Sequence, residues 1–422
     1  MVRSKNIAVL LGAVAASAWA PAHASVVTDW NAITLTCVQG QTAPVAIPAN
    51  RAGPSGGLDV ALVHAAVHDA VQANQGRFEA YHYENPALRG VGSPEAAAAA
   101  AAYGVLVGLY GADDPCLAAV TDPAVTYPGD PGLQAGNEAA AALLPLYRPS
   151  FALPDDPFTG GTAPGEWRPT PPTFAPGAFR FLTVTAPFVL NRTSQFRPPR
   201  QPPLSSVAYA REYNEVKSLG ALSDTARTKV TRTPEQTDLA LFWLTNPFHA
   251  WHATVRAIAE AHLDDVGDQA RLFALVSLAS ADAAITAWET KFHYNFWRPE
   301  TAIGEGDNDG NPRTAGDPDW VPFIPTPPYP DHSSGANNLS GSILGILEFY
   351  FGDEFEFSVA STTPGLLVNP RPYHRFSDAA LDVVEVRILQ GIHFRHADET
   401  ARRQGRRVAH WVFMKSLRPV AD

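Results

Sequence analysis

Apolar residues recur at helical spacing along much of the chain. One stripe of the segment "LDVALVHAAVHDAVQAN" is formed by four valines: Val60, Val63, Val67 and Val71. A second N-terminal helix is predicted in "SPEAAAAAAAYGVLVGLY", an alanine-rich segment that Ser93 and Pro94 begin. The sequence shows no alternating strand pattern of any length and no internal repeat. We therefore predict an all-α fold.

Helical patterns dominate the second half of the chain as well. The segment "TPEQTDLALFWL" has Thr233 at the N-cap position and Gln236 three residues later, which is the spacing of a capping box. A long helix is predicted from about Asp268, and it ends before Pro299. A further helix begins near Asn338, and the last one runs through "ADETARRQGRRVAHWVFMKSL".

A proline-rich stretch separates these two helical regions. Residues 145–203 contain 14 prolines, which exclude regular helix there. The stretch also contains many aromatic residues, so we expect it to pack against the rest of the chain as part of one unit. The predicted organisation is a single domain, 25–422, made of N-terminal helices (25–144), a proline-rich connection (145–204) and a helical bundle (205–422).

The first residues have the pattern of a secretory signal peptide. Arg3 and Lys5 precede an apolar run, and "AHA" supplies small residues before a cleavage point at Ser25. The apolar run is too short to span a membrane. No later stretch approaches the apolar length of a membrane helix, so we expect no membrane insertion. The sequence predicts a leader at 1–24 and a secreted or periplasmic protein.

The net charge of the chain indicates which partners it can bind, and its cysteine content indicates how the cysteines pair. Removing Arg3 and Lys5 with the leader takes the formal net charge from −11 to −13. Such an acidic chain argues against a nucleic-acid partner. The mature chain has two cysteines, Cys37 and Cys116, and in an oxidising compartment they are predicted to form one disulfide.

Two cations near the end of the long predicted helix are candidates for an anion site. Lys291 and Arg298 lie seven residues apart, which places them on nearly the same face of a helix. On one interpretation they grip a single oxyanion, because Arg supplies a planar fork and Lys a point charge. On the other they form a solvated basic helix end that the helix dipole favours.

Two more segments carry polar groups of the same kind. In "YPDHSSGANNLSGS", the Ser334 hydroxyl and the Gly335 amide precede a helix and could donate to an anion. In "RILQGIHFRHAD", Arg387 is followed by His393, whose neutral ring nitrogen could coordinate a metal or attack a phosphoryl group. The alternative for His393 is a structural histidine packed under Phe394.

In this order and spacing, "KFHYNFWRP", "SSGAN" and "RILQGIHFR" resemble the signature segments of the vanadium-dependent haloperoxidases and the type-2 phosphatidic acid phosphatases that share their fold. The chain is similar to the bacterial, exported, haloperoxidase-like branch from about Ala208 onwards. The resemblance implies the all-α helical bundles of that fold and a vanadate cofactor. It also implies the site: equatorial oxygens neutralised by Lys291, Arg298 and Arg387, hydrogen bonds from Ser334 and Gly335, and vanadium bound by His393.

The chain departs from the family pattern at Ala336, where the family usually has an acid–base histidine. Ser333 also replaces the usual proline. Candidates to replace the missing group are His332, four residues earlier, and His396, three residues after His393. The anion-binding residues remain, so the sequence predicts an intact oxyanion site with an altered proton relay.

Three functions fit these residues. The first is a vanadate-dependent haloperoxidase that uses hydrogen peroxide and a halide to make hypohalous acid, or oxidises a small organic acceptor, with His393, Lys291 and His332 as its catalytic residues. The second is an acid phosphatase with His393 as nucleophile, because vanadate has the shape and charge of a phosphoryl-transfer transition state. The third is a non-catalytic vanadate- or phosphate-binding protein. The chain's length favours the first, and the oligomeric state stays open, with a homodimer as one alternative.

Overall fold

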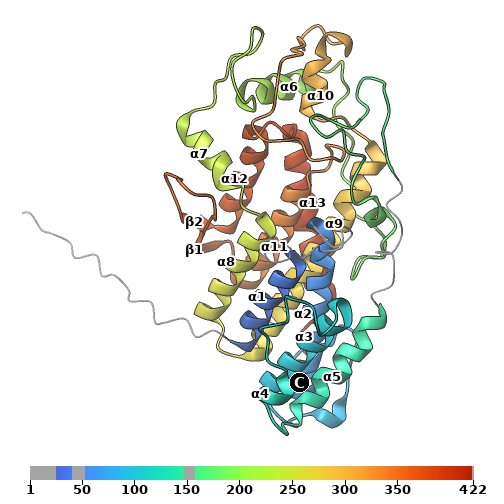
Figure 1. Ribbon diagram of the computed structural model, residues 1–422, viewed down its shortest axis with the longest axis vertical. Coiled ribbons are helices and arrows are strands. Elements are labelled where there is room, and N and C mark those ends of the chain that lie inside the picture. Colours follow the sequence, from blue (N-terminus) through green and yellow to red (C-terminus); the bar gives the residue numbers. More distant parts are fainter. Residues whose placement is uncertain (1–24, 40–52, 147–156, 421–422) are drawn as a thin grey trace, which may run out of the picture.

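The structure of the chain is a computed structural model that describes residues 25–39, 53–146 and 157–420 (Figure 1). The predicted leader, 1–24, lies outside the described residues. The α-helices are α1 (Val26–Gln39), α2 (Gly56–Gln75), α3 (Pro94–Tyr110), α4 (Pro123–Thr126), α5 (Gly132–Leu143), α6 (Val207–Leu219), α7 (Pro234–Phe242), α8 (Pro247–His262), α9 (Val266–Tyr294), α10 (Pro299–Gly304), α11 (Gly335–Phe351), α12 (Phe376–Leu389) and α13 (Arg395–Lys415). Five 3-10 helices accompany them: η2 (Gly53–Ser55), η3 (Pro86–Leu88), η4 (Leu144–Leu146), η6 (Arg180–Thr183) and η7 (Gly306–Asn308). The all-α prediction is confirmed.

One small hairpin was not expected from the sequence. Strands β1 (Glu354–Val359) and β2 (Arg371–Arg375) pair antiparallel, with Phe357 opposite Tyr373. The buried face of β1 packs on α12, where the ring centroids of Phe357 and Phe376 are 4.9 Å apart. The strand pattern of β1 is only six residues long, so periodicity did not predict it. A two-stranded hairpin needs further packing to be stable, and α12 supplies it here.

The long helix α9 is the centre of the fold. It packs against α2, α11 and α13, and it runs through the middle of the view in Figure 1. By length and composition it could cross a membrane, which corrects the expectation that no such stretch follows the leader. However, 94% of its most apolar window is buried inside the protein, so it is a core helix. Apolar residues from the N-terminal helices through α13 form one continuous core around it.

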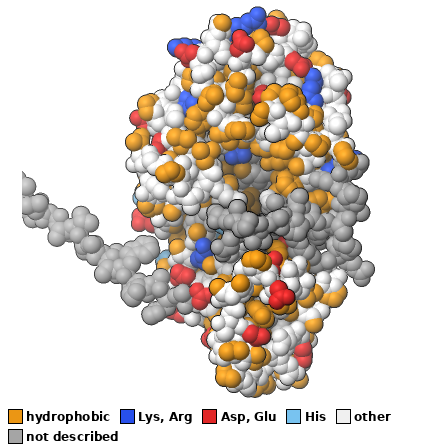
Figure 2. Space-filling model, viewed as in Figure 1, with side chains coloured by type: hydrophobic (Ala, Val, Ile, Leu, Met, Phe, Trp, Pro, Cys, Tyr) orange, Lys and Arg blue, Asp and Glu red, His pale blue; other side chains and the backbone are white. Residues whose placement is uncertain are grey.

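The described part of the proline-rich connection packs against this core helix. Asp282 of α9 accepts hydrogen bonds from the amides of Phe188 (2.6 Å), Val189 (2.9 Å) and Leu190 (2.9 Å). Trp167 from the same connection is fully buried. The side chain of this core residue therefore satisfies backbone N–H groups in a segment that has no regular helix. Figure 2 shows the same view in space-filling form, with hydrophobic side chains around a hollow in the middle of this face.

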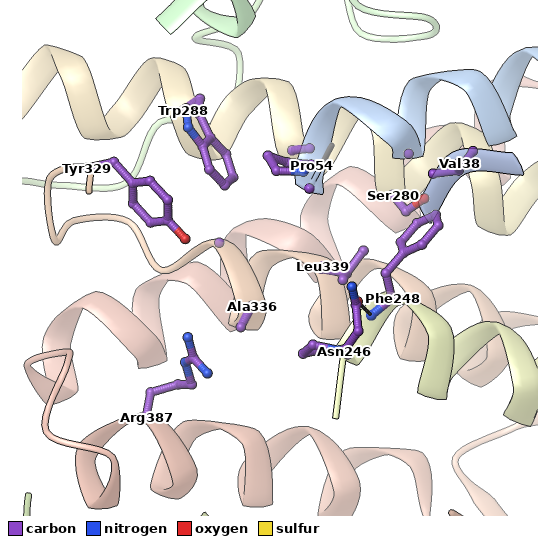
Figure 3. Close-up of a pocket in the computed structure, with 15 residues that line it drawn as sticks. Val38, Pro54, Asn246, Phe248, Ser280, Trp288, Tyr329, Ala336, Leu339 and Arg387 are labelled. Carbon is purple, nitrogen blue, oxygen red and sulfur yellow. Dashed lines mark hydrogen bonds between the residues drawn. The ribbon is translucent and has the colours of Figure 1, made fainter. Parts of the chain in front are cut away.

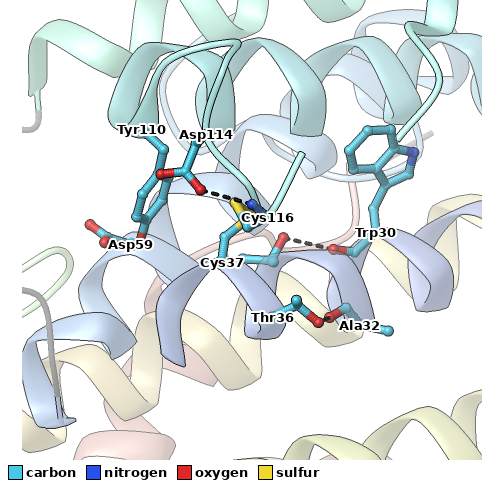
Figure 4. The surroundings of a disulfide bond; sticks show 9 residues. Trp30, Ala32, Thr36, Cys37, Asp59, Tyr110, Asp114 and Cys116 are labelled. Carbon is cyan, nitrogen blue, oxygen red and sulfur yellow. Dashed lines mark hydrogen bonds between the residues drawn. A yellow bond between two sulfur atoms is a disulfide. The ribbon is translucent and has the colours of Figure 1, made fainter. Parts of the chain in front are cut away.

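The predicted disulfide is present in the structure. Cys37, near the end of α1, is bonded to Cys116, in the turn that follows α3 (Figure 4). The Cys116 amide donates to Asp114 Oδ1 at 2.9 Å, which holds that turn. The two cysteines are 79 residues apart in sequence, so the bond restricts a long loop of the unfolded chain.

We expect the double variant Cys37→Ser, Cys116→Ser to lose about 2–5 kcal/mol of unfolding free energy, because the unfolded chain regains the entropy of the open loop. Urea unfolding followed by circular dichroism measures this loss. A reductant should lower the wild-type midpoint and leave that of the double variant unchanged. Equal midpoints for the two oxidised proteins would contradict a stabilising role for the bond.

Candidate functional site

The structure brings together the polar residues that the sequence singled out. We call Lys291, Arg298, Ser334, Gly335, Arg387 and His393 the cradle. Arg298 Nη1 lies 3.1 Å from His393 Nε2. The charges of Arg298 and Arg387 both act on Lys291, although Arg387 comes from a different segment of the chain. A stretch of about a hundred residues thus converges on one place.

Lys291 enters the cradle from the last turn of α9. Its side chain is fully buried, and Nζ donates to the main-chain oxygens of Pro330 (2.8 Å) and Asp331 (3.1 Å). Nζ also lies 4.9 Å from the ring centroid of Tyr329, where the aromatic face favours a cation. Burial, and then the charge of Arg298, hold the pKa of Lys291 well below its usual value. An added anion would favour its charged form.

Arg298 reaches the cradle by a different route from the one predicted. Helix α9 ends at Tyr294, because Asn295 adopts a left-handed conformation (φ 49°) whose amide donates to the Lys291 oxygen at 2.9 Å. Arg298 therefore does not share a helix face with Lys291, and it precedes α10 in an extended conformation. The expectation of two cations on one continuous helix was wrong, since a left-handed residue followed by a proline-started helix interrupts it.

Hydrogen bonds to carbonyl oxygens hold the Arg298 side chain in place. Nε donates to the Tyr329 oxygen (2.8 Å) and Nη1 to the Ile392 oxygen (2.6 Å). Nη2 is buried and has no hydrogen-bond partner among the residues that the structure describes. A buried guanidinium with one open donor is arranged to accept an additional anionic partner.

Ser334 and Gly335 stand at the beginning of α11. This helix begins at Gly335, three residues earlier than the predicted start near Asn338. The first amides of a helix have no acceptor within it, so the Gly335 N–H points out of the helix N-terminus together with the positive end of the dipole. A Cβ at Gly335 would lie 3.0 Å from the indole of Trp288, so glycine lets that ring pack against the turn.

Arg387 and His393 come from the end of α12 and the turn after it. Arg387 Nη1 donates to Gln390 Oε1 (2.7 Å), whereas its buried Nε has no partner in the described chain. Gly391 then reverses the backbone with a positive φ of 79°, close against the Gly220 oxygen. Only glycine fits such a conformation without strain. The reversal returns His393 to the cradle.

The sequence analysis missed the partner of His393. Asp331 is fully buried, and its Oδ1 lies 2.7 Å from His393 Nδ1. Gln201 Nε2 donates to the other carboxylate oxygen at 3.1 Å. An Nδ1–H donated to Asp331 leaves the lone pair of Nε2 on the cradle side, as in histidines oriented for metal binding. Asp331 lies in the segment already singled out, but a carboxylate beside a proline gives no sequence signal of this contact.

A second buried carboxyl group, Asp398, was also missed. Asn337 Nδ2 donates to Asp398 Oδ1 at 2.8 Å, and the Ser334 hydroxyl is a further neighbour. Burial raises the pKa of Asp398 well above its usual value. Burial therefore favours the protonated form of this carboxyl group, which lies beside a cradle residue. Asp398 belongs to the segment "HFRHAD", in which only the two histidines were predicted to act.

Neither proposed replacement for the missing histidine hydrogen-bonds a cradle residue. His332 Nε2 donates to the Pro199 oxygen at 2.9 Å, and its ring centroid lies 5.4 Å from that of His396. Burial, and then the neighbouring His396, lower the pKa of His332 to about 3. The relay role of His332 stays a prediction.

The cradle carries positive charge that no carboxylate neutralises directly. Within the described residues, no carboxylate oxygen of an Asp or Glu lies within 4.0 Å of a side-chain nitrogen of Lys291, Arg298 or Arg387. Burying such charges without a partner is costly. Open donors on Arg298 and Arg387, together with the lone pair of His393, fit a tetrahedral or trigonal-bipyramidal oxyanion with one histidine ligand. The donor set thus suits phosphate and vanadate.

Comparisons with known proteins agree with this site. Residues 271–422 match the family model of the second helical-bundle domain of vanadium chloroperoxidase, and they include every cradle residue. This C-terminal part of the chain is similar to that domain of the vanadium haloperoxidases. The chain is 30% identical over 148 residues to the vanadium chloroperoxidase of Curvularia inaequalis, a match covering 28% of this chain and 23% of the chloroperoxidase. The matched stretch therefore spans less than a quarter of that relative.

Solved structures extend the likeness of the haloperoxidase-like chain to almost its full length, at the level of the fold. A bacterial vanadium-dependent iodoperoxidase superposes with a TM-score of 0.73 at 24% identity, covering 94% of this chain and 96% of the iodoperoxidase. A holo-type bacterial vanadium-dependent chloroperoxidase gives a TM-score of 0.68 at 17% identity, covering 93% and 97% of the two chains. The N-terminal helices thus belong to the same overall fold as the cradle.

We expect inorganic phosphate to stabilise the protein, because an anion neutralises the buried cations of the folded state only. At about 100 times the dissociation constant, the gain is about 2.7 kcal/mol. Lys291→Met should weaken phosphate binding about 10- to 100-fold, since it removes a charge-assisted hydrogen bond. Thermal unfolding against phosphate concentration measures both effects.

Lys229→Met is the matched control, because the Lys229 side chain is 81% exposed and lies outside the cradle. Its phosphate response should equal that of the wild type. A Lys291→Met protein with an unchanged phosphate response would show that the cradle is not the anion site.

Proposed function

We propose that this protein is a vanadate-dependent haloperoxidase, which oxidises a halide with hydrogen peroxide to hypohalous acid. The observation that carries the proposal is the cradle itself: three cations without an ion-paired carboxylate around one buried histidine, whose Nε2 lies 3.1 Å from Arg298 Nη1. The vanadium-dependent relatives support this choice of cofactor and reaction.

Each cradle residue would have a defined task toward vanadate. His393 Nε2 would be the ligand atom, because Nδ1 is engaged by Asp331 at 2.7 Å. Lys291, Arg298 and Arg387 would neutralise the oxygens of the anion, and Ser334 with the Gly335 amide would donate to them. When bound, vanadate would supply a Lewis acid that activates peroxide for attack by a halide. Lys291 keeps one ammonium donor beyond its bonds to the Pro330 and Asp331 oxygens, and this donor would serve the anion.

The electrostatics of the cradle keep the ligand atom available. Burial, and then the charges of Arg298 and Lys291, hold the pKa of His393 well below its usual value. A histidine with a lowered pKa is neutral at and above its unperturbed pKa of about 6.5, so its lone pair is not lost to a proton near neutral pH. The rings of Trp288 and Tyr329 meet edge to face beside the cradle, with their centroids 5.1 Å apart.

Acid phosphatase activity is the alternative on the same residues. His393, neutral and oriented by Asp331, is equally suited to attack a phosphate ester. A phosphatase must also protonate the leaving alcohol, and Ala336 removes the family residue for that step. The missing residue affects both reactions, and we rank halide oxidation first because the similar proteins are vanadium-dependent peroxidases.

We also propose that the protein is exported to the periplasm or the medium. The signal-peptide pattern of the leader and the Cys37–Cys116 disulfide support this location, since disulfides persist in oxidising compartments.

With phosphate-free protein loaded with orthovanadate, we expect peroxide-dependent bromination of an organic dye. His393→Ala should lower vanadate affinity more than about 100-fold, because even outer partners of metal ligands typically contribute about 10–100-fold. Equilibrium dialysis of vanadate and the bromination rate test this. His374→Ala, at a histidine that is 80% exposed on the hairpin, is the control and should match the wild type.

Hydrolysis of p-nitrophenyl phosphate is assayed beside the bromination. Hydrolysis without vanadate and no bromination would establish the phosphatase instead. Tight vanadate binding with neither reaction would leave a binding protein.

Restoring the family residue tests the altered relay. Ala336 and Arg387 both line one cavity, so the substitution would place an imidazole at its wall (Figure 3). We expect Ala336→His to raise bromination turnover about tenfold or more, because positioned acid–base groups typically contribute about 10²–10⁴-fold. Ala253→His, on the exposed face of α8, is the control. No gain in a variant that still binds vanadate would show that proton transfer does not limit the natural protein.

A further inference from the structure

A groove of about 700 Å³ is lined by none of the cradle residues. Its walls come from the proline-rich connection (168–174), from helix α10 and the residue after it (300–305), and from the segment 318–325. It also shares no lining residue with the cavity beside Ala336. The volume falls within the range of small-molecule sites. The groove is therefore a separate candidate site, for which halide oxidation has no use.

Exposed apolar side chains gather along this groove. Phe174, Leu222 and Val321 line it, and each is more than half exposed. The Leu222 amide donates to the Val321 oxygen at 2.9 Å, which joins their two segments. Six prolines complete the wall: Pro169, Pro171, Pro172, Pro318, Pro322 and Pro325. Because proline rings restrict the backbone, the shape of the groove is fixed before a ligand arrives.

Phe174 has a backbone conformation that phenylalanine rarely adopts. Its φ is +48°, in the left-handed region that favours glycine. Its amide donates to the Thr170 oxygen at 3.0 Å, which closes the turn. This strained turn holds a large apolar ring in contact with water, and strain of this kind gathers at ligand sites. The ring is thus placed to contact a ligand in the groove.

Among the described residues that line the groove, Glu300 is the one carboxylate without an ion-paired cation. Glu305 pairs with Arg168 at 2.7 Å, so these two charges compensate each other. Glu300 is half-buried and accepts a hydrogen bond from Thr326 Oγ1 at 2.5 Å. Burial raises the pKa of Glu300, because water no longer solvates its charge fully. A cation bound beside this carboxylate would stabilise its charged form.

We infer that the groove binds an aromatic amine in its protonated form, with the ammonium against Glu300 and the ring against Phe174 and Val321. An anionic ligand would meet no open cation, because Arg168 is already engaged by Glu305. A second copy of the chain is a poorer occupant. A two-fold contact through this groove would bring two Glu300 carboxylates into one interface without a counter-charge.

Binding is tested without vanadate, halide or peroxide, so that it does not depend on the proposed function. Equilibrium dialysis should show saturable binding of tryptamine, an aromatic ring with an ammonium group. Tryptophol, which has a hydroxyl in place of the ammonium, should bind about tenfold more weakly. Ethylammonium should also bind about tenfold more weakly, because it lacks the ring. No saturable binding, or equal affinity for tryptamine and tryptophol, would overturn the inference.

Glu300→Gln tests the charge alone, since the amide oxygen can still accept the hydrogen bond from Thr326. It should weaken tryptamine binding about tenfold and leave tryptophol binding unchanged. Glu356→Gln is the matched control, because the Glu356 side chain is 86% exposed on the hairpin, and it should bind both ligands like the wild type. Wild-type affinity of Glu300→Gln for tryptamine would refute the assigned contact.

A second variant fills the groove. Gly304 lines it, and a Cβ added there would meet no atom within 4 Å. Gly304→Phe should therefore fold normally and weaken the binding of both tryptamine and tryptophol about tenfold or more. Ala253→Phe, exposed on α8, is the matched control and should bind like the wild type.

Phe174→Gly separates binding from stability. Glycine tolerates the positive φ, so the melting temperature should stay unchanged or rise, while tryptamine binding should weaken about threefold or more. Wild-type affinity in both Gly304→Phe and Phe174→Gly would place tryptamine elsewhere and overturn the inference. Sedimentation of the wild type checks the other occupant. A dimer that Gly304→Phe dissociates, together with no tryptamine binding, would show that a second copy covers the groove.

Discussion

The constraint on which the site depends is the burial of cations that lack carboxylate partners. Lys291 and Arg298 are fully buried, and in the described chain their hydrogen bonds go mainly to carbonyl oxygens. Carbonyl dipoles orient a cation without cancelling its charge, so the positive field remains directed at one place. A carboxylate at bonding distance would stabilise the free protein more, but it would also compete with the anion. Burying these cations lowers the stability of the free protein, and it leaves them able to bind an anion.

Stability for this arrangement comes from elsewhere in the molecule. Helix α9 carries Lys291 at its end and is buried along nearly its whole length against helices from both halves of the chain. The N-terminal helices, held by the Cys37–Cys116 bond, complete the core that surrounds α9. A long, fully packed helix has little freedom to move its last turn. The cation is thus positioned by packing far from the site, which is how a preorganised electrostatic site is maintained.

The sequence was sufficient for the helical class and the disulfide, because each has a local signal. It also singled out the residues that form the cradle, and their roles stay predictions. It was insufficient where a contact depends on tertiary structure. Arg298 was identified, but its placement on one helix face with Lys291 was wrong, since the left-handed Asn295 cannot be foreseen from periodicity. Asp331 and Asp398 were missed because nothing local shows that a carboxyl group will be buried beside a histidine or a serine. The hairpin was missed because its stability lies in the packing of Phe357 on α12.

Ala336 determines how a proton can move at this site. An acid–base histidine at this position would favour rapid proton transfer at a bound anion. Ala336 offers only a methyl group, which lines the cavity beside Gly335 and Arg387. His332 is a weak base, because burial and the neighbouring His396 lower its pKa to about 3. The substitution therefore bears on the rate of the proposed reaction and not on the binding of the anion, because the cradle residues themselves are retained.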